Sequence, residues 1–97
     1  IATAWLAIST WLATKGPILT RLNVDSIWGN ATANKGRLEL YKPKTAKGGH
    51  AVTMVGYTPE TFIVRNSWGT GWGDRGFAHA SLAYAQSAFT EAYGVEV

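Results

Sequence analysis

The chain has 97 residues, 46% of them apolar, which suits one small domain. A chain of this length buries a modest fraction of its surface on folding, so its margin of stability is small. It contains no cysteine, and this excludes disulfides, thiolate metal sites and a thiol nucleophile within the chain itself. Nine Lys and Arg against six Asp and Glu give a formal charge of +3, which would modestly favour acidic partners or nucleic acid.

Residues 1–14 are predicted to form an amphipathic helix, because large apolar side chains recur there at helical spacing. The apolar stripe comprises Ile1, Ala4, Trp5, Ile8, Trp11 and Leu12. Gly16 and Pro17 then end the helix, since glycine can adopt the left-handed cap conformation and proline cannot continue the hydrogen-bond ladder. The segment is too short to span a bilayer, so no membrane partner is expected.

The next segment is predicted to contain two strands separated by a turn and a loop. Residues 18–24 alternate their side chains between two faces, which is typical of a half-buried strand. Asp25 is placed to cap a short helical turn over residues 26–30. Residues 37–41 favour a short strand with loops on both sides.

Lys42, Lys44 and Lys47 are the one concentration of basic residues in the sequence. They alternate with turn-forming and small residues in a predicted loop. Two interpretations stay open: a plain solvated loop, or a contact patch.

The firmest pattern begins at residue 50. Segments 50–57 and 62–68 are rich in β-forming residues and are joined by a turn that contains Pro59. They are therefore predicted to pair as an antiparallel hairpin. A glycine-dense loop over residues 69–76 follows.

The C-terminal part is predicted to add a third strand over residues 77–82, a helical turn over 83–89 and a closing strand over 91–97. One helix ahead of five or six strands predicts an α+β domain. We expect the N-terminal helix to pack on a curled antiparallel β-sheet or barrel, with residues 1–97 forming a single domain.

His50 and Asn66 are the candidates for chemistry. If the hairpin pairs residues of equal parity, their side chains share one face and lie within about 8 Å. An imidazole that donates to a fixed amide oxygen keeps its second nitrogen free to exchange a proton with a nucleophile. Trp68 would cover this contact, while Gly48 and Gly49 would allow a close approach to the ring. Structural interpretations compete, with the histidine as a core residue and the asparagine as a turn cap.

The same segments carry a family resemblance. "GGHAVTMVGY", over residues 48–57, and "FIVRNSWGTGWGDRGF", over 62–77, resemble the signature around the catalytic histidine and asparagine of papain-like cysteine peptidases. "KGPILTRLNV", over 15–24, is similar to the strand entry of that family. The resemblance covers about residues 3–82 and weakens over the rest of the chain.

The resemblance implies a role for each matching position. His50 corresponds to the general base and acid, and Asn66 to the residue that orients it. Trp68 matches the shield over their contact. Trp72 matches a tryptophan near the leaving side of a bound peptide. No cofactor and no metal are implied.

Three further positions match the substrate-binding cleft of the family. Gly49 and Ala51 flank the histidine where that cleft is lined. Arg21 stands where the family usually has a small residue in the pocket for the substrate's second side chain. Either the pocket is narrowed or it prefers acidic side chains, unless Arg21 is simply solvated.

The departures from the family pattern shape the functional expectation. Family members carry a cysteine nucleophile and a glutamine oxyanion donor on an N-terminal helical domain, which this sequence lacks. The chain also lacks an initial methionine. We therefore expect the C-terminal half of a papain-like peptidase, inactive alone, which needs a Cys-bearing half from a separate chain or a removed segment to act on peptide or protein substrates.

Two other classes stay open. The first is a non-catalytic papain-fold binding module, such as an effector or toxin fragment that engages a protein partner. The second is a nucleic-acid binder or nuclease that uses His50 and His79 with the loop lysines, although scattered basic residues make nucleic acid an unfavoured partner. The sequence leaves the compartment open, with secretion or delivery as an effector among the alternatives.

Overall fold

The computed structural model describes residues 2–94 of the chain and the side chains of residues 7–90. In chain order the elements are α1 (Ala2–Thr14), β1 (Ile18–Asn23), η1 (Ser26–Asn30), β2 (Arg37–Leu38), η2 (Pro43–Thr45), β3 (Gly49–Tyr57), β4 (Thr61–Arg65), β5 (Phe77–Ser81), α2 (Leu82–Ala88) and β6 (Phe89–Gly94). The two η elements are short 3-10 helices.

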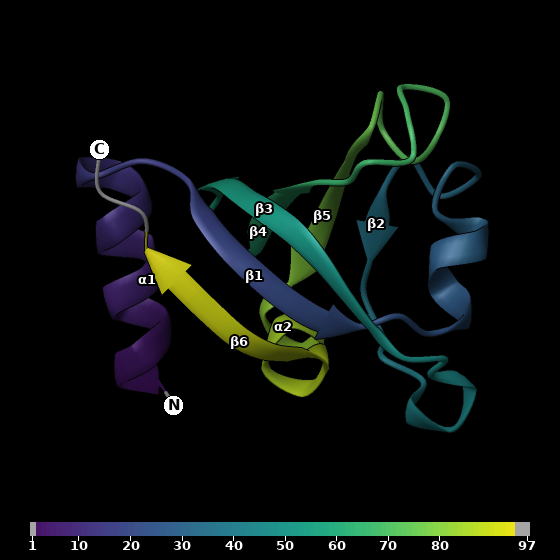
Figure 1. Cartoon of the computed structure of the whole chain (residues 1–97), viewed down its shortest axis with the longest axis horizontal. Coiled ribbons are helices and arrows are strands. Elements are labelled where there is room, and N and C mark those ends of the chain that lie inside the picture. Colours follow the sequence, from purple (N-terminus) through teal and green to yellow (C-terminus); the bar gives the residue numbers. More distant parts are fainter. Residues whose placement is uncertain (1, 95–97) are drawn as a thin grey trace.

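The strands form one twisted sheet in the order β2-β5-β4-β3-β1-β6 (Figure 1). Neighbouring strands are antiparallel except β2 and β5, which run parallel. The predicted α+β class is confirmed. The sheet is mixed rather than purely antiparallel, because β2 enters after η1 and aligns with β5. It also stays open rather than closing into a barrel, with β2 and β6 at its two edges.

The N-terminal helix is confirmed over Ala2–Thr14. Its described side chains that pack against the core are Ile8, Trp11 and Leu12. The stripe positions within residues 1–6 lie outside the described side chains. Gly16 follows the helix with a φ of 115°, the left-handed conformation expected of it. No helix among the described residues has the length and apolar character needed to cross a bilayer.

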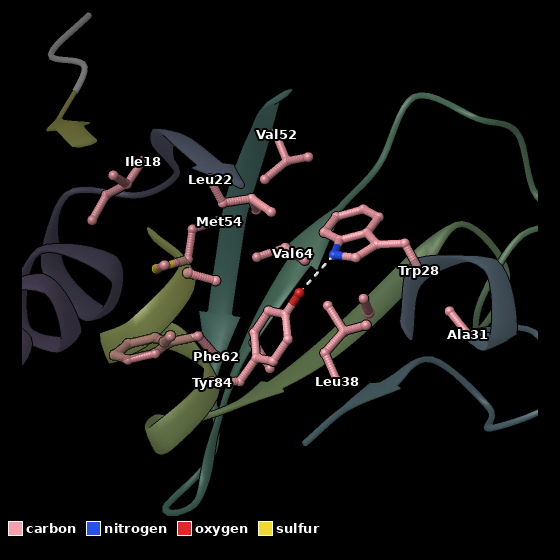
Figure 2. Packing of buried hydrophobic residues seen from close by; sticks show 14 residues of the cluster. Ile18, Leu22, Trp28, Ala31, Leu38, Val52, Met54, Phe62, Val64 and Tyr84 are labelled. Atoms are coloured by element: carbon pink, nitrogen blue, oxygen red, sulfur yellow. Dashed lines mark hydrogen bonds between the residues drawn. The ribbon is translucent and has the colours of Figure 1, made fainter. Parts of the chain in front are cut away.

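The core lies on one face of β1, β3 and β4. Burial alternates along β1, where Ile18, Thr20 and Leu22 are buried while Leu19 and Arg21 are exposed. From the facing strands the buried side chains are Val52, Met54, Phe62 and Val64. Figure 2 shows these side chains converging with Trp28, Leu38 and Tyr84 into one cluster. The alternation read from the sequence therefore sets which face of the sheet is covered.

The turn after β1 differs from its prediction. Asp25 does occupy the position before η1, but its side chain makes no capping hydrogen bond. Its carboxylate instead accepts hydrogen bonds from the Lys42 backbone N–H and the Tyr84 hydroxyl, each at 2.7 Å. The capping prediction was wrong because two long-range donors reach the same carboxylate.

The ends of several elements also differ. The strand predicted over residues 37–41 pairs only at Arg37–Leu38. The predicted helical turn begins one residue early as α2, where the Ser81 hydroxyl accepts a hydrogen bond from the Tyr84 N–H at 3.0 Å. β6 begins at Phe89, and the part of the closing strand predicted beyond residue 94 lies outside the described residues.

Candidate active site

The hairpin places His50 and Asn66 on one face of the sheet. Met54 faces Val64 in the register of β3 and β4, and continuing this register puts Asn66 opposite Val52. Asn66 is then one diagonal step from His50. Their side chains meet through His50 Nε2 and Asn66 Oδ1, 2.8 Å apart. The predicted contact is confirmed.

The register of the hairpin is not uniform, however. β3 carries one extra residue between Met54 and Gly56, so the pairing shifts by one beyond that point. The shift lies on the turn side of the site. Had it fallen between the site and Met54, His50 and Asn66 would point to opposite faces.

The hydrogen-bond partners fix the direction of the His50–Asn66 contact. Asn66 Oδ1 also accepts a hydrogen bond from the Ser67 backbone N–H, at 2.8 Å. A backbone N–H can only donate, so the atom between them is the amide oxygen and His50 Nε2 is the donor. In the neutral ring the proton therefore sits on Nε2 and the lone pair on Nδ1.

Asn66 is held rigidly where β4 ends. Its side chain is buried, and its backbone N–H donates to the Gly76 carbonyl at 3.0 Å. Gly76 has a φ of 91°, and a Cβ there would lie 3.3 Å from the Gly69 carbonyl oxygen. The loop 69–76 thus depends on glycine to fold back against Asn66. Within the described residues, Asn66 Nδ2 is a buried donor without a partner.

Two indole rings contact the imidazole of His50, and a third packs against one of them. Trp68 stacks on His50 with ring centroids 5.4 Å apart, and half of the Trp68 residue surface stays exposed. Trp28 meets His50 edge to face, with centroids 5.9 Å apart. Trp72 stacks on Trp28 at 4.9 Å and donates its indole N–H to the Trp28 carbonyl at 3.0 Å. Trp28 therefore connects the predicted residues to one another.

Sequence reasoning missed Trp28. It assigned the segment around this residue to a short helical turn and gave its side chain no role. The available signal was a large apolar side chain inside a five-residue turn that glycine and asparagine end. Such a side chain has to be buried against something outside the turn, but the sequence does not indicate against what.

The predicted substrate-binding positions divide between two places. Gly49 and Ala51 alternate with His50 along β3 and so point to the opposite face of the sheet. Arg21 of β1 pairs with Ala51 of β3, and a Cβ on Gly49 would lie 2.5 Å from the Arg21 guanidinium. These three residues are brought together. Trp72 instead stacks on Trp28.

An open groove of about 520 Å³ crosses the same face as Ala51. Besides Ala51, its lining includes Leu19 from β1, Arg65 from β4, and Asn66 and Ser67 at the end of β4. The groove thus runs from the back of the His50–Asn66 pair along the outward surface of β1 and β3.

The remaining ionisable candidates have simple surroundings. His79 Nε2, on β5, lies 3.0 Å from Asp74 Oδ2 in the loop before that strand. The lysines of the loop before β3 are exposed. Among residues 2–94, no cluster of three or more His, Asp or Glu side chains is arranged to bind a metal.

Comparison with known proteins addresses the whole chain. A model of the papain family of cysteine proteases matches residues 3–94, so the similarity extends through β6, beyond the motifs. The cathepsin B-like protein CP3 of Giardia intestinalis is 38% identical over 81 residues, which cover 73% of this chain and 24% of that protein. Papain from Carica papaya is 57% identical over 28 residues, or 29% of this chain and 8% of papain.

Solved structures agree with this. Xylellain, a cysteine protease from Xylella fastidiosa, superposes with a TM-score of 0.72 at 26% identity, over 90% of this chain and 34% of that one. The SERA5 proenzyme of Plasmodium falciparum gives 0.62 at 28% identity, over 84% of this chain and 23% of that one. The chain spans between 8% and 34% of the length of these relatives. A match that includes nearly every residue, together with the shared fold, shows that this chain belongs to the papain family of cysteine proteases.

Proposed function

We propose that this chain is the His- and Asn-bearing C-terminal half of a papain-like cysteine peptidase, and that residues 1–97 complete an active site with a Cys- and Gln-bearing half. The observation that carries the proposal is the 2.8 Å hydrogen bond from His50 Nε2 to Asn66 Oδ1. It leaves the Nδ1 lone pair available to a thiol. An amide orients the ring without adding a charge beside it.

The proposed reaction uses His50 as a proton carrier. Nδ1 takes the proton of the cysteine thiol, and the thiolate sulfur adds to the carbonyl carbon of a peptide bond. The C–N bond then breaks, and the amine leaves with the proton from Nδ1. Water next attacks the thioester, giving its proton to Nδ1, and the acid departs as the sulfur recovers a proton. The glutamine of the other half stabilises the oxyanion.

The surroundings of His50 support this role. Trp68 covers one face of the ring and limits the access of water to the His50–Asn66 bond, which strengthens that bond. On the other face of the sheet, Gly49 and Ala51 offer a surface without large side chains. We propose that Arg21 there favours substrates with an acidic side chain, and that Trp72 lies towards the leaving side of the peptide.

The outward face of β1 and β3 is where we place the Cys-bearing half. Leu19 and Val55 are large hydrophobic residues with 47% and 37% of their surface exposed. The groove beside Leu19 begins behind Asn66, so a partner that fills it would reach the edge of the active site. The chain spans 24% of the cathepsin B-like protein and 34% of xylellain, so a papain-family protein has room for such a half.

The proposal is tested by complementation. The chain is mixed with a Cys- and Gln-bearing half of a papain-family protein, and cleavage of a fluorogenic peptide is measured. His50→Ala should abolish the cleavage that the mixture produces, while His79→Ala, the matched histidine control, should retain it. Cleavage that survives His50→Ala would refute the assignment.

A second candidate is supported by the absence of cysteine from all 97 residues. The chain could then act as a binding module that keeps the fold without catalysis. In that case, a protein partner that binds the outward face of β1 and β3 would bind His50→Ala and the unchanged chain equally well. Its binding would instead weaken with a charge at Leu19.

A further inference from the structure

A buried chain of hydrogen bonds lies behind the aromatic cluster. Asp25 has only 3% of its surface exposed, and its Oδ1 accepts the Tyr84 hydroxyl proton at 2.7 Å. The second carboxylate oxygen accepts the Lys42 backbone N–H, also at 2.7 Å. The Tyr84 oxygen in turn accepts the indole N–H of Trp28 at 2.8 Å, drawn as a dashed line in Figure 2. Every polar atom of the three side chains has a partner.

The direction of this chain is fixed by its chemistry. An indole N–H can only donate and an ionised carboxylate can only accept, so the Tyr84 hydroxyl must accept from Trp28 and donate to Asp25. Burial, and then the hydrogen bond to Asp25, raise the pKa of Tyr84 far above its ordinary value. The hydroxyl therefore keeps the proton that this arrangement requires.

Trp28 connects the buried chain to the imidazole. The residue is 1% exposed, and its ring contacts His50 edge to face at 5.9 Å and Trp68 at 5.6 Å. Trp68 stacks on the imidazole itself, with its ring 28° from the imidazole plane. Asn66 holds one nitrogen of His50 and the two indoles limit the tilt of its ring. A rotation of Trp28 would remove its contact with the imidazole and allow the ring to tilt on that side.

The backbone around Trp28 does not hold the side chain by itself. Trp28 sits in η1, a five-residue 3-10 helix without a side-chain cap at its start. The residue that would supply the cap is Asp25, whose carboxylate is committed to Tyr84 and Lys42 instead. The hydrogen-bond partner that fixes the indole N–H is therefore Tyr84, which α2 brings from 56 residues further along the sequence, while Trp72 stacks on the ring.

We infer that Tyr84 and Asp25 are positioning residues for His50, acting through the buried indole of Trp28. The catalytic meaning of this inference rests on the proposed function, but the coupling itself is a property of the folded chain. Loss of the Tyr84 hydroxyl leaves the indole N–H of Trp28 without its acceptor. The indole then shifts, and the imidazole edge that packs against it becomes less constrained.

The test measures His50 directly by NMR on the full 97-residue chain. Tyr84→Phe removes a single oxygen atom and should shift the His50 ring-proton resonances, whose positions report the ring currents of Trp28 and Trp68. It should also speed solvent exchange of the Nε2 proton about tenfold, equivalent to about 1.4 kcal/mol. Asp25→Asn, which keeps the shape of the side chain but supplies one acceptor in place of two, should move the same signals in the same direction.

Two controls separate positioning from a general loss of stability. Tyr41→Phe removes a hydroxyl from the tyrosine that packs edge to face on Tyr84, at 5.6 Å. Ile18→Val weakens the core at the opposite end of the cluster in Figure 2. Neither should move the His50 signals.

The inference is overturned if folded Tyr84→Phe gives His50 shifts and exchange within the range of the two controls. If Tyr84→Phe does not fold, Asp25→Asn is judged by the same criterion. The proposed function fails separately, when the unchanged chain does not complement a Cys-bearing half. Where complementation succeeds, Tyr84→Phe should lower kcat while leaving KM unchanged.

Discussion

Replacing Asn66 with alanine separates orientation from stability. Asn66 Oδ1 accepts from His50 Nε2 and the Ser67 N–H, both at 2.8 Å, so the change leaves two donors without their acceptor. His50 is only partly buried and Ser67 is exposed, and water can therefore reach both. The change also removes Asn66 Nδ2, a buried donor without a partner. These effects oppose each other.

The magnitudes follow from that balance. Each lost hydrogen bond costs about 1 kcal/mol, and removal of an unpartnered buried donor returns about 1–3 kcal/mol. Unfolding by urea should therefore show a stability change below about 2 kcal/mol. The imidazole, in contrast, loses its fixed plane and tautomer. A misplaced catalytic group lowers kcat about 100-fold, equivalent to about 2.8 kcal/mol in the barrier.

The assay pairs urea unfolding of the chain with kcat in the complementation mixture. Asn34→Ala, in the exposed loop before β2, is the matched control and should change neither value. The reasoning is refuted if Asn66→Ala leaves kcat unchanged. It is equally refuted if stability falls by far more than the activation barrier rises, since the asparagine would then be a structural residue.

Three further predictions concern the loop, the exposed face and the buried tyrosine. Gly73→Ala should lower the melting temperature, because Gly73 has a φ of 62° and a Cβ would lie 2.6 Å from the Phe77 carbonyl oxygen. Gly71→Ala meets no atom within 4 Å and should not lower it. Leu19→Asp should abolish complementation while changing unfolding by less than about 0.5 kcal/mol, because Leu19 is 47% exposed; unaltered complementation would exclude this face. Because the pKa of Tyr84 is raised by folding, its contribution to stability is complete below the ordinary pKa of 10.0 and is lost above it. Stability should fall by up to about 1.4 kcal/mol more per pH unit in the unchanged chain than in Tyr84→Phe, measured by urea titration above that pH; parallel curves would contradict the assignment.

The fold was predictable where side-chain periodicity is strong. The amphipathic helix, the hairpin and the position of His50 and Asn66 on one face of the sheet all follow from local sequence patterns. Such patterns are reliable where one face of an element is buried and the other is exposed. The class of the fold followed from the order of these elements.

Other features could not be predicted because they depend on distant parts of the chain. Asp25 has the right position for a cap, but Tyr84 and Lys42 compete successfully for its carboxylate. The parallel pairing of β2 with β5 involves only Arg37 and Leu38, too few residues to carry a pattern. The contact of Trp28 with His50 joins η1 to β3, two elements that only the tertiary fold brings together.

The additional residue in β3, between Met54 and Gly56, separates the hairpin into two halves with different alignment. The turn at residues 58–60 can change in length without a shift of register at the site, because the bulge already accommodates an unequal number of residues in the two strands. Relatives or engineered variants could thus lengthen or shorten that tip while His50 keeps its orientation. No bulge separates His50 from an insertion between residues 51 and 53. A one-residue insertion there would turn the imidazole to the opposite face of the sheet.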